Sequence, residues 1–198
     1  MPRISTDPRT FARRPSLATR LALGASRRMM GGDADTVGAM AHRPGVLFPW
    51  ALLETTAQRG RSVLPPHLPE LVTFVVSVRL GCSWCIDFGA SRWEQQGLDP
   101  QVLRHAVTWR QAPAGVFDDA TRAAFAYAEA MSADPVEVDD AMVAALVEHV
   151  GEDGVVEISF WAALENMRGR FNSALGLTSQ GFSSGDACAL AAAQPSSR

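Results

Sequence analysis

Glycine and proline divide the sequence into segments of helical length, and this punctuation limits the possible folds more than any other feature. Apolar residues recur with a helical period across residues 70–80, and the run ends at Gly81. A second run covers residues 83–96 and ends at Gly97, and a third begins at Asp99-Pro100 with a favoured capping sequence. The first half of the chain is therefore predicted to form consecutive helices.

The second half shows the same pattern with clearer caps. Aspartates at 118–119 begin a predicted helix that ends at Asp134-Pro135, and aspartates at 139–140 begin another that stops at Gly151. The longest helix is predicted from about residue 153 to 175. No fixed-period repeat is present, and no linker is long enough to split the chain.

One segment is ambiguous by local composition. Residues 71–78 are rich in β-branched side chains, and local propensity alone predicts a buried strand there. We predict a helix instead, because the apolar pattern runs unbroken across residues 70–80 before it ends at Gly81. With a further helical run at 50–60, the chain is predicted to be all-α.

Composition and charge limit the function. Hydrophobic residues make up 47% of the chain and charged residues 20%, which is typical of one compact soluble domain. The apolar runs are far shorter than the roughly 20 residues of a membrane helix, so no membrane partner is expected. All 18 basic residues are arginine, which excludes a lysine Schiff base and a P-loop lysine. The net charge of −3 gives no reason to expect nucleic acid as a partner.

Charge is distributed unevenly along the chain. The first 44 residues hold eight arginines and three acidic residues, whereas the rest holds ten arginines and eighteen acidic residues. We predict a basic N-terminal extension at 1–35 that is poorly ordered or docked on the surface, a helical domain at 36–176 and a loosely held C-terminal tail at 177–198. A transit peptide or a nucleic-acid arm is the alternative for the extension. Arg20 interrupts its one apolar stretch, which argues against a secretory signal.

The three cysteines, Cys82, Cys85 and Cys188, are too few for a disulfide scaffold, so we expect a reducing, cytoplasmic location. Cys82 and Cys85 form a Cys-x-x-Cys motif at the start of a predicted helix. The unpaired N–H groups and partial positive charge of a helix N-terminus stabilise a thiolate. The spacing lets the two sulfurs meet in disulfide geometry, so that one attacks a substrate and the other resolves the product.

Three other uses of this pair compete with a redox role. Half of a zinc site would need a second pair, and the four histidines are widely scattered, so no metal is expected. A structural disulfide would add little in a reducing cell, and the polar Ser83 argues against two incidental core cysteines. The redox role is therefore favoured, and it needs no cofactor.

The residues around this motif resemble the carboxymuconolactone decarboxylase/alkylhydroperoxidase D-like family. The family signature is a glutamate, an eleven-residue gap, a Cys-x-x-Cys and a histidine four residues past the second cysteine. Glu70, Cys82 and Cys85 match its first three parts. A softer likeness covers residues 42–47 and 165–176, and in all it spans about residues 40 to 183.

This resemblance implies a single-domain, all-α helical bundle that assembles as a trimer or a multiple of it, with sites near subunit contacts. It also implies a thiol-dependent oxidoreductase that reduces a small hydroperoxide or a disulfide. In the family's mechanism Cys85 would be oxidised to sulfenic acid, Cys82 would condense with it, and Glu70 would take part in proton transfer. A thiol electron donor would then reduce the pair.

The sequence departs from the signature at two positions. Gly89 stands where the motif histidine is expected, and Trp84 stands between the cysteines where some members carry another histidine. The relay between thiol and carboxylate therefore lacks its middle member.

Two residues are candidates for a proton relay or for a supporting role beside it. Asp87 follows Cys85 by two residues, but helix geometry points it about 200° away, so capping or binding elsewhere is the better prediction. His67 shares a face with Glu70 if their helix begins early enough; an exposed histidine in a proline-rich turn is the plainer interpretation.

A polar cluster interrupts the largely apolar C-terminal helix. Glu165 and Arg168 are spaced to pair at i, i+3, and Asn166 and Arg170 at i, i+4. Together with Trp84, the residues Glu165, Asn166 and Arg170 are candidates for a substrate pocket or a subunit interface.

Three functions stay open from the sequence. The first is the redox enzyme. The second is a non-redox decarboxylase or lyase, in which arginine would hold a small lactone or carboxylic acid; retention of both cysteines argues against it. The third is a non-catalytic binding protein with a basic arm, against which the negative charge of the remaining chain argues.

Overall fold

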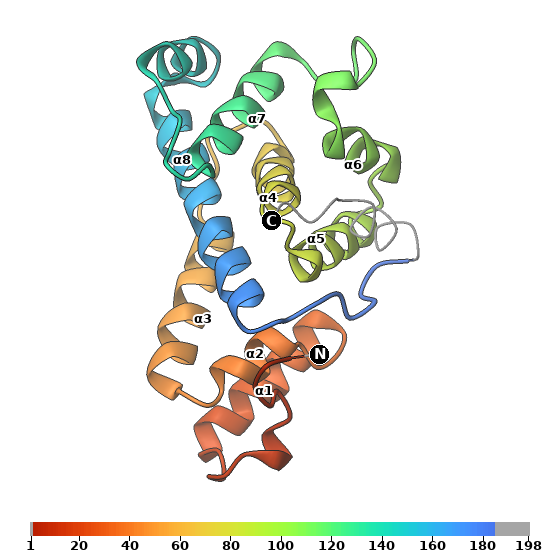
Figure 1. Ribbon diagram of the computed structural model, residues 1–198, viewed down its shortest axis with the longest axis vertical. Helices are drawn as coiled ribbons and strands as arrows, with labels where there is room; N and C mark the ends of the chain where they lie inside the picture. The colour runs from red at the N-terminus through yellow and green to blue at the C-terminus, as the bar shows by residue number, and fades with distance from the viewer. Residues whose placement is uncertain (1, 185–198) are drawn as a thin grey trace.

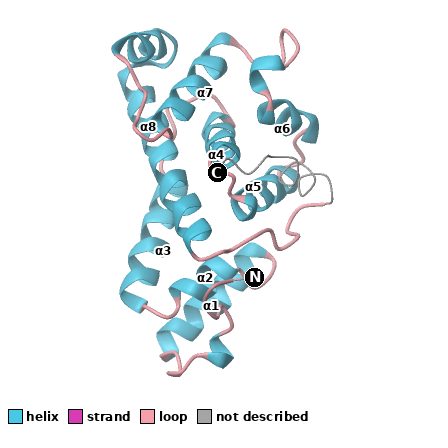
Figure 2. Ribbon diagram, in the orientation of Figure 1, coloured by secondary structure: helices cyan, strands magenta, loops and turns pink. Residues whose placement is uncertain are grey.

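The computed structural model of the chain describes residues 2–184, and every regular element in that range is a helix (Figure 1, Figure 2). The α-helices are α1 (Leu17–Met30), α2 (Asp35–Met40), α3 (Pro44–Arg59), α4 (Leu68–Arg79), α5 (Ser83–Gln95), α6 (Pro100–Val107), α7 (Asp119–Met131) and α8 (Asp140–Ala174). Two short 3₁₀ turns, η1 (Pro8–Thr10) and η2 (Trp109–Gln111), accompany them. The predicted all-α fold is confirmed. None of these helices is long and apolar enough to cross a bilayer.

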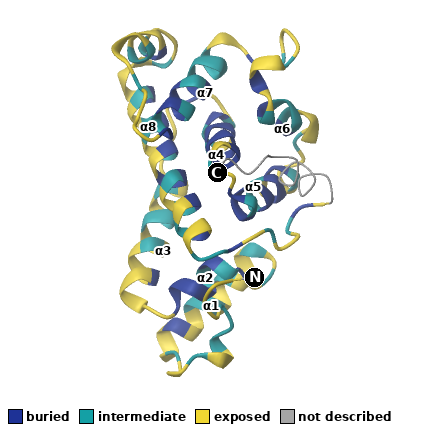
Figure 3. Cartoon of the chain, in the orientation of Figure 1, coloured by how far each residue is buried: buried dark blue, intermediate teal, exposed yellow. Residues whose placement is uncertain are grey.

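Helix α4 lies at the centre of the core, where Figure 3 shows its buried residues enclosed by the neighbouring helices. It packs against α5, α6, α7 and α8. Val72, Val75 and Val76 are at most 1% exposed, so the β-branched residues that favour a strand locally are covered by other helices. Tertiary packing overrides local propensity here, and the helix predicted across residues 70–80 is confirmed.

The predicted helix boundaries carry the expected caps. Asp99, Asp118 and Asp139 each accept a hydrogen bond at 2.8 Å from a backbone N–H in the helix that they precede. Gly151 has a φ of 71°, which other residues rarely adopt, and it breaks the backbone of α8. The helices predicted on either side of Gly151 are therefore both present and joined at a kink.

The N-terminal extension is docked on the helical domain. The backbone N–H of Arg3 donates to the carbonyl of Leu175 at 2.8 Å, and its guanidinium donates to the carbonyl of Ala174 at 2.7 Å. The chain at Thr6 crosses α2 so closely that a Cβ at Gly38 would lie 2.2 Å from the Thr6 carbonyl oxygen. Of the two states expected for this extension, docking on the surface is the one that the structure shows.

A fully buried carboxylate, Asp87 of α5, binds the C-terminal segment at 177–184. Asp87 Oδ2 accepts the backbone N–H groups of residues 180–182, and Oδ1 accepts both the N–H and the hydroxyl of Ser183, all within 3.1 Å. As its helix position predicts, Asp87 binds away from Cys85. The tail that we expected to be loosely held is instead tied to α5 over these residues. Cys188 lies outside the described residues.

Replacing this carboxylate tests the attachment. Asp87→Asn is expected to lower the free energy of unfolding by roughly 2–4 kcal/mol, because an amide NH₂ would face backbone N–H groups that lose their acceptor. Urea denaturation measures the change. Asp153→Asn, at an exposed position of α8, is the matched control, expected to change stability by less than about 0.5 kcal/mol. Equal effects of the two variants would contradict the attachment.

The same carboxylate should make stability depend on pH. Burial alone would raise the pKa of Asp87, but the hydrogen bonds from Ser183, Phe182 and Ser179 outweigh it, and the pKa lies below its ordinary value of 3.8. A lowered pKa contributes stability above the ordinary value, and this contribution disappears as the pH falls through the folded-state pKa. Below about pH 4, wild type should therefore lose stability more steeply than Asp87→Asn.

Candidate active site

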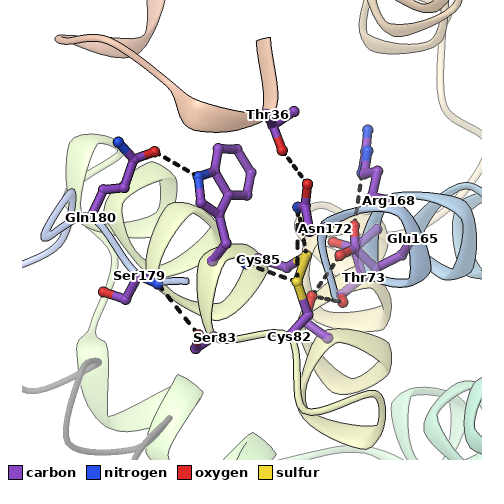
Figure 4. Close-up of a disulfide and its surroundings, with 12 residues drawn as sticks. Thr36, Thr73, Cys82, Ser83, Cys85, Glu165, Arg168, Asn172, Ser179 and Gln180 are labelled. Carbon is purple, nitrogen blue, oxygen red and sulfur yellow. Dashed lines mark hydrogen bonds and ion pairs between the residues drawn. A yellow bond between two sulfur atoms is a disulfide. The ribbon is translucent and has the colours of Figure 1, made fainter. Parts of the chain in front are cut away.

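Cys82 and Cys85 are joined by a disulfide at the N-terminus of α5 (Figure 4). Cys82 is the N-cap of the helix, and its Sγ accepts the backbone N–H of Cys85 at 3.3 Å. Gly81, with a φ of 63°, turns the chain from α4 into α5. The Cys82 N–H then donates to the carbonyl of Ser77 at 3.0 Å. The predicted pairing of these two cysteines is confirmed, and it leaves sulfur facing the positive end of the helix.

Both cysteines are buried, and one amide from α8 faces their sulfurs. Asn172 Nδ2 lies 3.5 Å from Cys85 Sγ and 3.9 Å from Cys82 Sγ. Its Oδ1 accepts a short hydrogen bond from the Thr36 hydroxyl of α2, which fixes the orientation of the amide. Sequence reasoning did not assign Asn172 or Thr36 to the site. The available signal was one polar residue, Asn172, seven positions after Glu165 on an apolar helix face.

An aromatic cluster covers the other side of the first turn of α5. Trp84 stacks on Phe88 with ring centroids 5.1 Å apart, and Phe182 contacts both rings edge-on at 5.7 Å. Trp84 Nε1 donates to Gln180 Oε1 at 2.8 Å. Trp84, which replaces the second histidine of some family members, therefore anchors the segment at 177–184 beside the disulfide.

A second polar group from α8, Glu165, lies on the α4 side of the site and is 4% exposed. It accepts hydrogen bonds from the Ser77 hydroxyl at 2.8 Å and from Arg168 Nη1 at 3.0 Å. Arg168 also donates through Nε and Nη2 to both carboxylate oxygens of Glu54 on α3. The predicted pair of Glu165 and Arg168 is confirmed.

Burial shifts the titration of this group. It raises the pKa of Glu165 above its ordinary value, and the charge of Arg168 reduces that shift without cancelling it. Burial would lower the pKa of Arg168, but its bonds to Glu54 and the charge of Glu165 outweigh this, so its pKa lies above the ordinary value. Arg168 therefore stays charged between the two carboxylates, whereas the raised pKa of Glu165 makes this carboxyl easier to protonate than an exposed one.

The structure does not bring Glu70 and His67 to the sulfurs. Glu70 is exposed in the first turn of α4. Cys82 follows the opposite end of this helix, about 13 Å away along the helix axis. His67 precedes the same helix, and its ring lies 5.6 Å from the ring of Trp93, near the far end of α5. Gly89 lies in the middle of α5, and a Cβ there would make an ordinary 3.6 Å contact with the Phe74 side chain.

The remaining candidates from the sequence lie away from the disulfide. Asn166 donates to the Ser132 hydroxyl at 2.7 Å and to the carbonyl of Ala162 at 3.0 Å, and Arg170 is exposed. The i, i+4 pair expected of them is thus replaced, for Asn166, by a bond toward the end of α7. Among residues 2–184, no three His, Cys, Asp or Glu side chains are grouped so that they could hold a metal ion.

The all-helical fold is that of the alkylhydroperoxidase D-like proteins. The sequence model of the carboxymuconolactone decarboxylase family matches residues 47–130. The uncharacterised protein YnjA of Escherichia coli K12 is 33% identical over 156 residues, which cover 79% of this chain and 85% of YnjA. The chain belongs to the carboxymuconolactone decarboxylase family.

Solved structures share the fold at lower identity. The apo debrominase Bmp8 has a TM-score of 0.75 at 17% identity, covering 89% of this chain and 91% of Bmp8. A peroxidase-related protein from Silicibacter sp. TM1040 has a TM-score of 0.75 at 21% identity, covering 88% and 90% of the two chains. An alkylhydroperoxidase core protein from Ralstonia eutropha JMP134 has a TM-score of 0.70 at 19% identity, covering 83% and 87%.

The amide of Asn172 should tune the reduced pair. Asn172→Ala is expected to raise the pKa of the more reactive thiol by about one unit, because a thiolate loses a hydrogen-bond donor that faces it. The pH dependence of iodoacetamide alkylation in the reduced protein measures this shift. Asn166→Ala, on the same helix but bonded to Ser132, is the matched control. Identical profiles for both variants and wild type would show that the amide does not act on the thiols.

Proposed function

We propose that this protein is a thiol-dependent oxidoreductase that uses Cys82 and Cys85 to reduce a small hydroperoxide or a disulfide. The observation that carries the proposal is the disulfide at the N-terminus of α5, with the Asn172 amide facing both of its sulfurs. A helix N-terminus and an amide donor both stabilise the thiolate that such chemistry needs. Membership of the carboxymuconolactone decarboxylase family, and a fold shared with peroxidase-related proteins, support it.

In this proposal the cysteine pair reduces a hydroperoxide in two steps. The Cys85 thiolate attacks the peroxide, an S–O bond forms, the O–O bond breaks, and the leaving alkoxide takes up a proton. Cys82 then loses its proton and attacks the Cys85 sulfur, so that the S–S bond forms and hydroxide leaves as water. A thiol donor returns the disulfide to two thiols. We assign the attack to Cys85 because its sulfur lies closer to the Asn172 amide and the residue is more exposed, at 7% against 2%.

A halogenated aromatic is a second candidate substrate. The fold is shared with the debrominase Bmp8, one of whose variants was solved with 2,3,4-tribromopyrrole. In this chain an aromatic cluster of Trp84, Phe88 and Phe182 borders the cysteine pair. Thiolate attack on the halogen would form an S–halogen bond and release a carbanion that takes up a proton. Attack by the second thiol would then form the disulfide and release halide. The non-redox decarboxylase or lyase has less support, because it gives the two cysteines no role.

We further propose that the protein acts in the cytoplasm as a homo-oligomer, a trimer or a multiple of it, without a nucleic-acid or membrane partner. Large apolar side chains that are at least 60% exposed support association: Leu17, Leu21, Met29, Leu52, Val63, Val136 and Val156. Such side chains on α1, α3 and α8 gain by burial against another copy.

A thiol titration tests the redox proposal. The reduced protein is expected to lose two of its three thiols to a stoichiometric hydroperoxide, with a Cys82–Cys85 bond found by peptide mapping. Cys85→Ser should react far more slowly, whereas Cys188→Ser should still lose two thiols and serves as the control. Thiol loss with a bromopyrrole and release of bromide, but no loss with peroxide, would select the second candidate. If neither reagent oxidises Cys82 and Cys85, the proposal is wrong.

The empty position of the motif histidine offers a gain-of-function test. Gly89→His should raise the rate of peroxide reduction by roughly 10²-fold if it restores the family relay, because a positioned acid–base group contributes at least that much. Glu70→Gln should change wild type little, since no side chain at 89 links Glu70 to the cysteines, but it should remove the gain in Gly89→His. Gly89→Ala is the control for the added Cβ, for which the helix has room. A correctly folded Gly89→His with no gain would show that the relay is not rebuilt this way.

A further inference from the structure

Glu165 is a buried ionisable group beside the cysteine pair that the proposed reaction does not yet use. Ser77 links the two: its hydroxyl bonds Glu165 Oε1 at 2.8 Å, and its carbonyl accepts the Cys82 N–H at 3.0 Å. One turn along α8 from Glu165, a Cβ at Gly169 would lie 3.6 Å from Cys82 Cβ, so this helix face runs directly against Cys82. Figure 4 shows Glu165 and Asn172 reaching from the same helix toward the disulfide.

The hydrogen bonds at Ser77 can hold Glu165 in either protonation state. The Ser77 hydroxyl lies 2.8 Å from two acceptors, the carbonyl of Thr73 and Glu165 Oε1. A hydroxyl has one proton, so it donates to only one of them. If Glu165 is protonated, its O–H donates to Ser77 Oγ, Ser77 donates to Thr73, and every group is satisfied. An ionised Glu165 is satisfied as well, because it accepts hydrogen bonds from the Ser77 hydroxyl and Arg168 Nη1. The geometry therefore holds both forms of Glu165, as a group that gains and loses a proton requires.

Burial and the charges around Glu165 together make its neutral form easier to reach than that of an exposed glutamate. Arg168 of α8 is paired with Glu54 of α3 through two donors, which balances one positive charge with one negative charge. If Glu165 is also ionised, two carboxylates share the one guanidinium of Arg168, and a net negative charge remains in the interior. From α4 it faces the neutral Ser77, whose carbonyl accepts the N–H of Cys82. A thiolate at Cys82 and a carboxylate at 165 would disfavour each other.

We propose that Glu165 controls the protonation of Cys82, acting through Ser77, and takes the part of proton acceptor that the absent motif histidine leaves open. This role rests on the proposed redox function. When Cys82 attacks the sulfenic acid of Cys85, its thiol proton passes to ionised Glu165, and the S–S bond forms as the S–O bond breaks. The leaving hydroxide takes up a proton from solvent and departs as water, so Glu165 keeps the thiol proton while the disulfide is present. When a donor thiolate breaks the disulfide, the departing Cys82 sulfur takes its proton from protonated Glu165. Because it acts through Ser77, Glu165 is a positioning residue.

Titration of the Cys82 thiolate tests this coupling without any substrate. In the background Cys85→Ser with Cys188→Ser, the ultraviolet absorbance of the thiolate is followed against pH. With Glu165 present, two coupled ionisations are expected. Glu165→Gln should leave one, with the pKa of Cys82 lower by about one unit, because a neighbouring negative charge is gone. Glu152→Gln, at an exposed position of α8, is the matched control and should match its parent.

Ser77→Ala covers the case in which Glu165→Gln does not fold. It removes a donor from the ionised carboxylate, so the coupled transition should move to higher pH, opposite to the shift in Glu165→Gln. A Cys82 titration that neither variant changes would overturn the proposal.

A single-turnover reaction separates this proposal from the redox function itself. After one equivalent of hydroperoxide, Glu165→Gln should form the Cys85 sulfenic acid at the wild-type rate but close the disulfide roughly 10²-fold more slowly, so that dimedone traps more of the intermediate. Equal closure rates would overturn the role of Glu165. If wild type forms no sulfenic acid, the peroxidase function fails, and the thiolate titration still decides whether Glu165 acts on Cys82.

Discussion

The close packing of α8 against the turn between α4 and α5 is the constraint on which the whole site depends. Gly169 permits it, because a Cβ there would lie 2.7 Å from Leu80 Cδ1. Glu165 precedes Gly169 by four residues and Asn172 follows it by three, so all three lie on one face of the helix. A larger residue at 169 would have to displace the Leu80 side chain and would crowd Cys82, from whose Cβ a Cβ at 169 would already be only 3.6 Å away.

The two sides of the disulfide differ in how they are covered. On the inner side, α8 supplies hydrogen-bonded polar groups. Burial strengthens their electrostatic effect on the sulfurs, because water does not screen them. On the outer side, Trp84, Phe88 and the segment at 177–184 form an aromatic cover that depends on the carboxylate of Asp87. The attachment of the C-terminal segment therefore helps to exclude water from the cysteine pair.

The sequence predicts what depends on near neighbours in the chain. Capping aspartates, Gly151, the Cys82–Cys85 bond and the pair of Glu165 with Arg168 all involve local spacing, and the structure contains each of them. The contacts that complete the site join distant segments: Ser77 with Glu165 is separated by 88 positions and Thr36 with Asn172 by 136. Apolar periodicity places such residues on a helix face, but it does not say which helix the face meets. Asp87 illustrates both cases. Its direction away from Cys85 follows from helix geometry, whereas its hydrogen-bond partners at 179–183 do not follow from the sequence.

The loss of the signature histidine fits the polarity of the surrounding helices. Between Glu70 and the cysteines, the contact of α4 with α5 is lined by apolar residues such as Phe74 and Ile86, and Gly89 adds no polar atom there. A proton passing along this path would cross a largely apolar contact. The contact of α8 with α4, in contrast, holds a connected series of hydrogen bonds from Glu54 through Arg168 and Glu165 to Ser77. Burial favours the protonated form of a carboxyl, and hydrogen-bonded neighbours allow it to give up or regain its proton. The α8 side therefore offers the better route for the proton exchange proposed between Glu165 and Cys82.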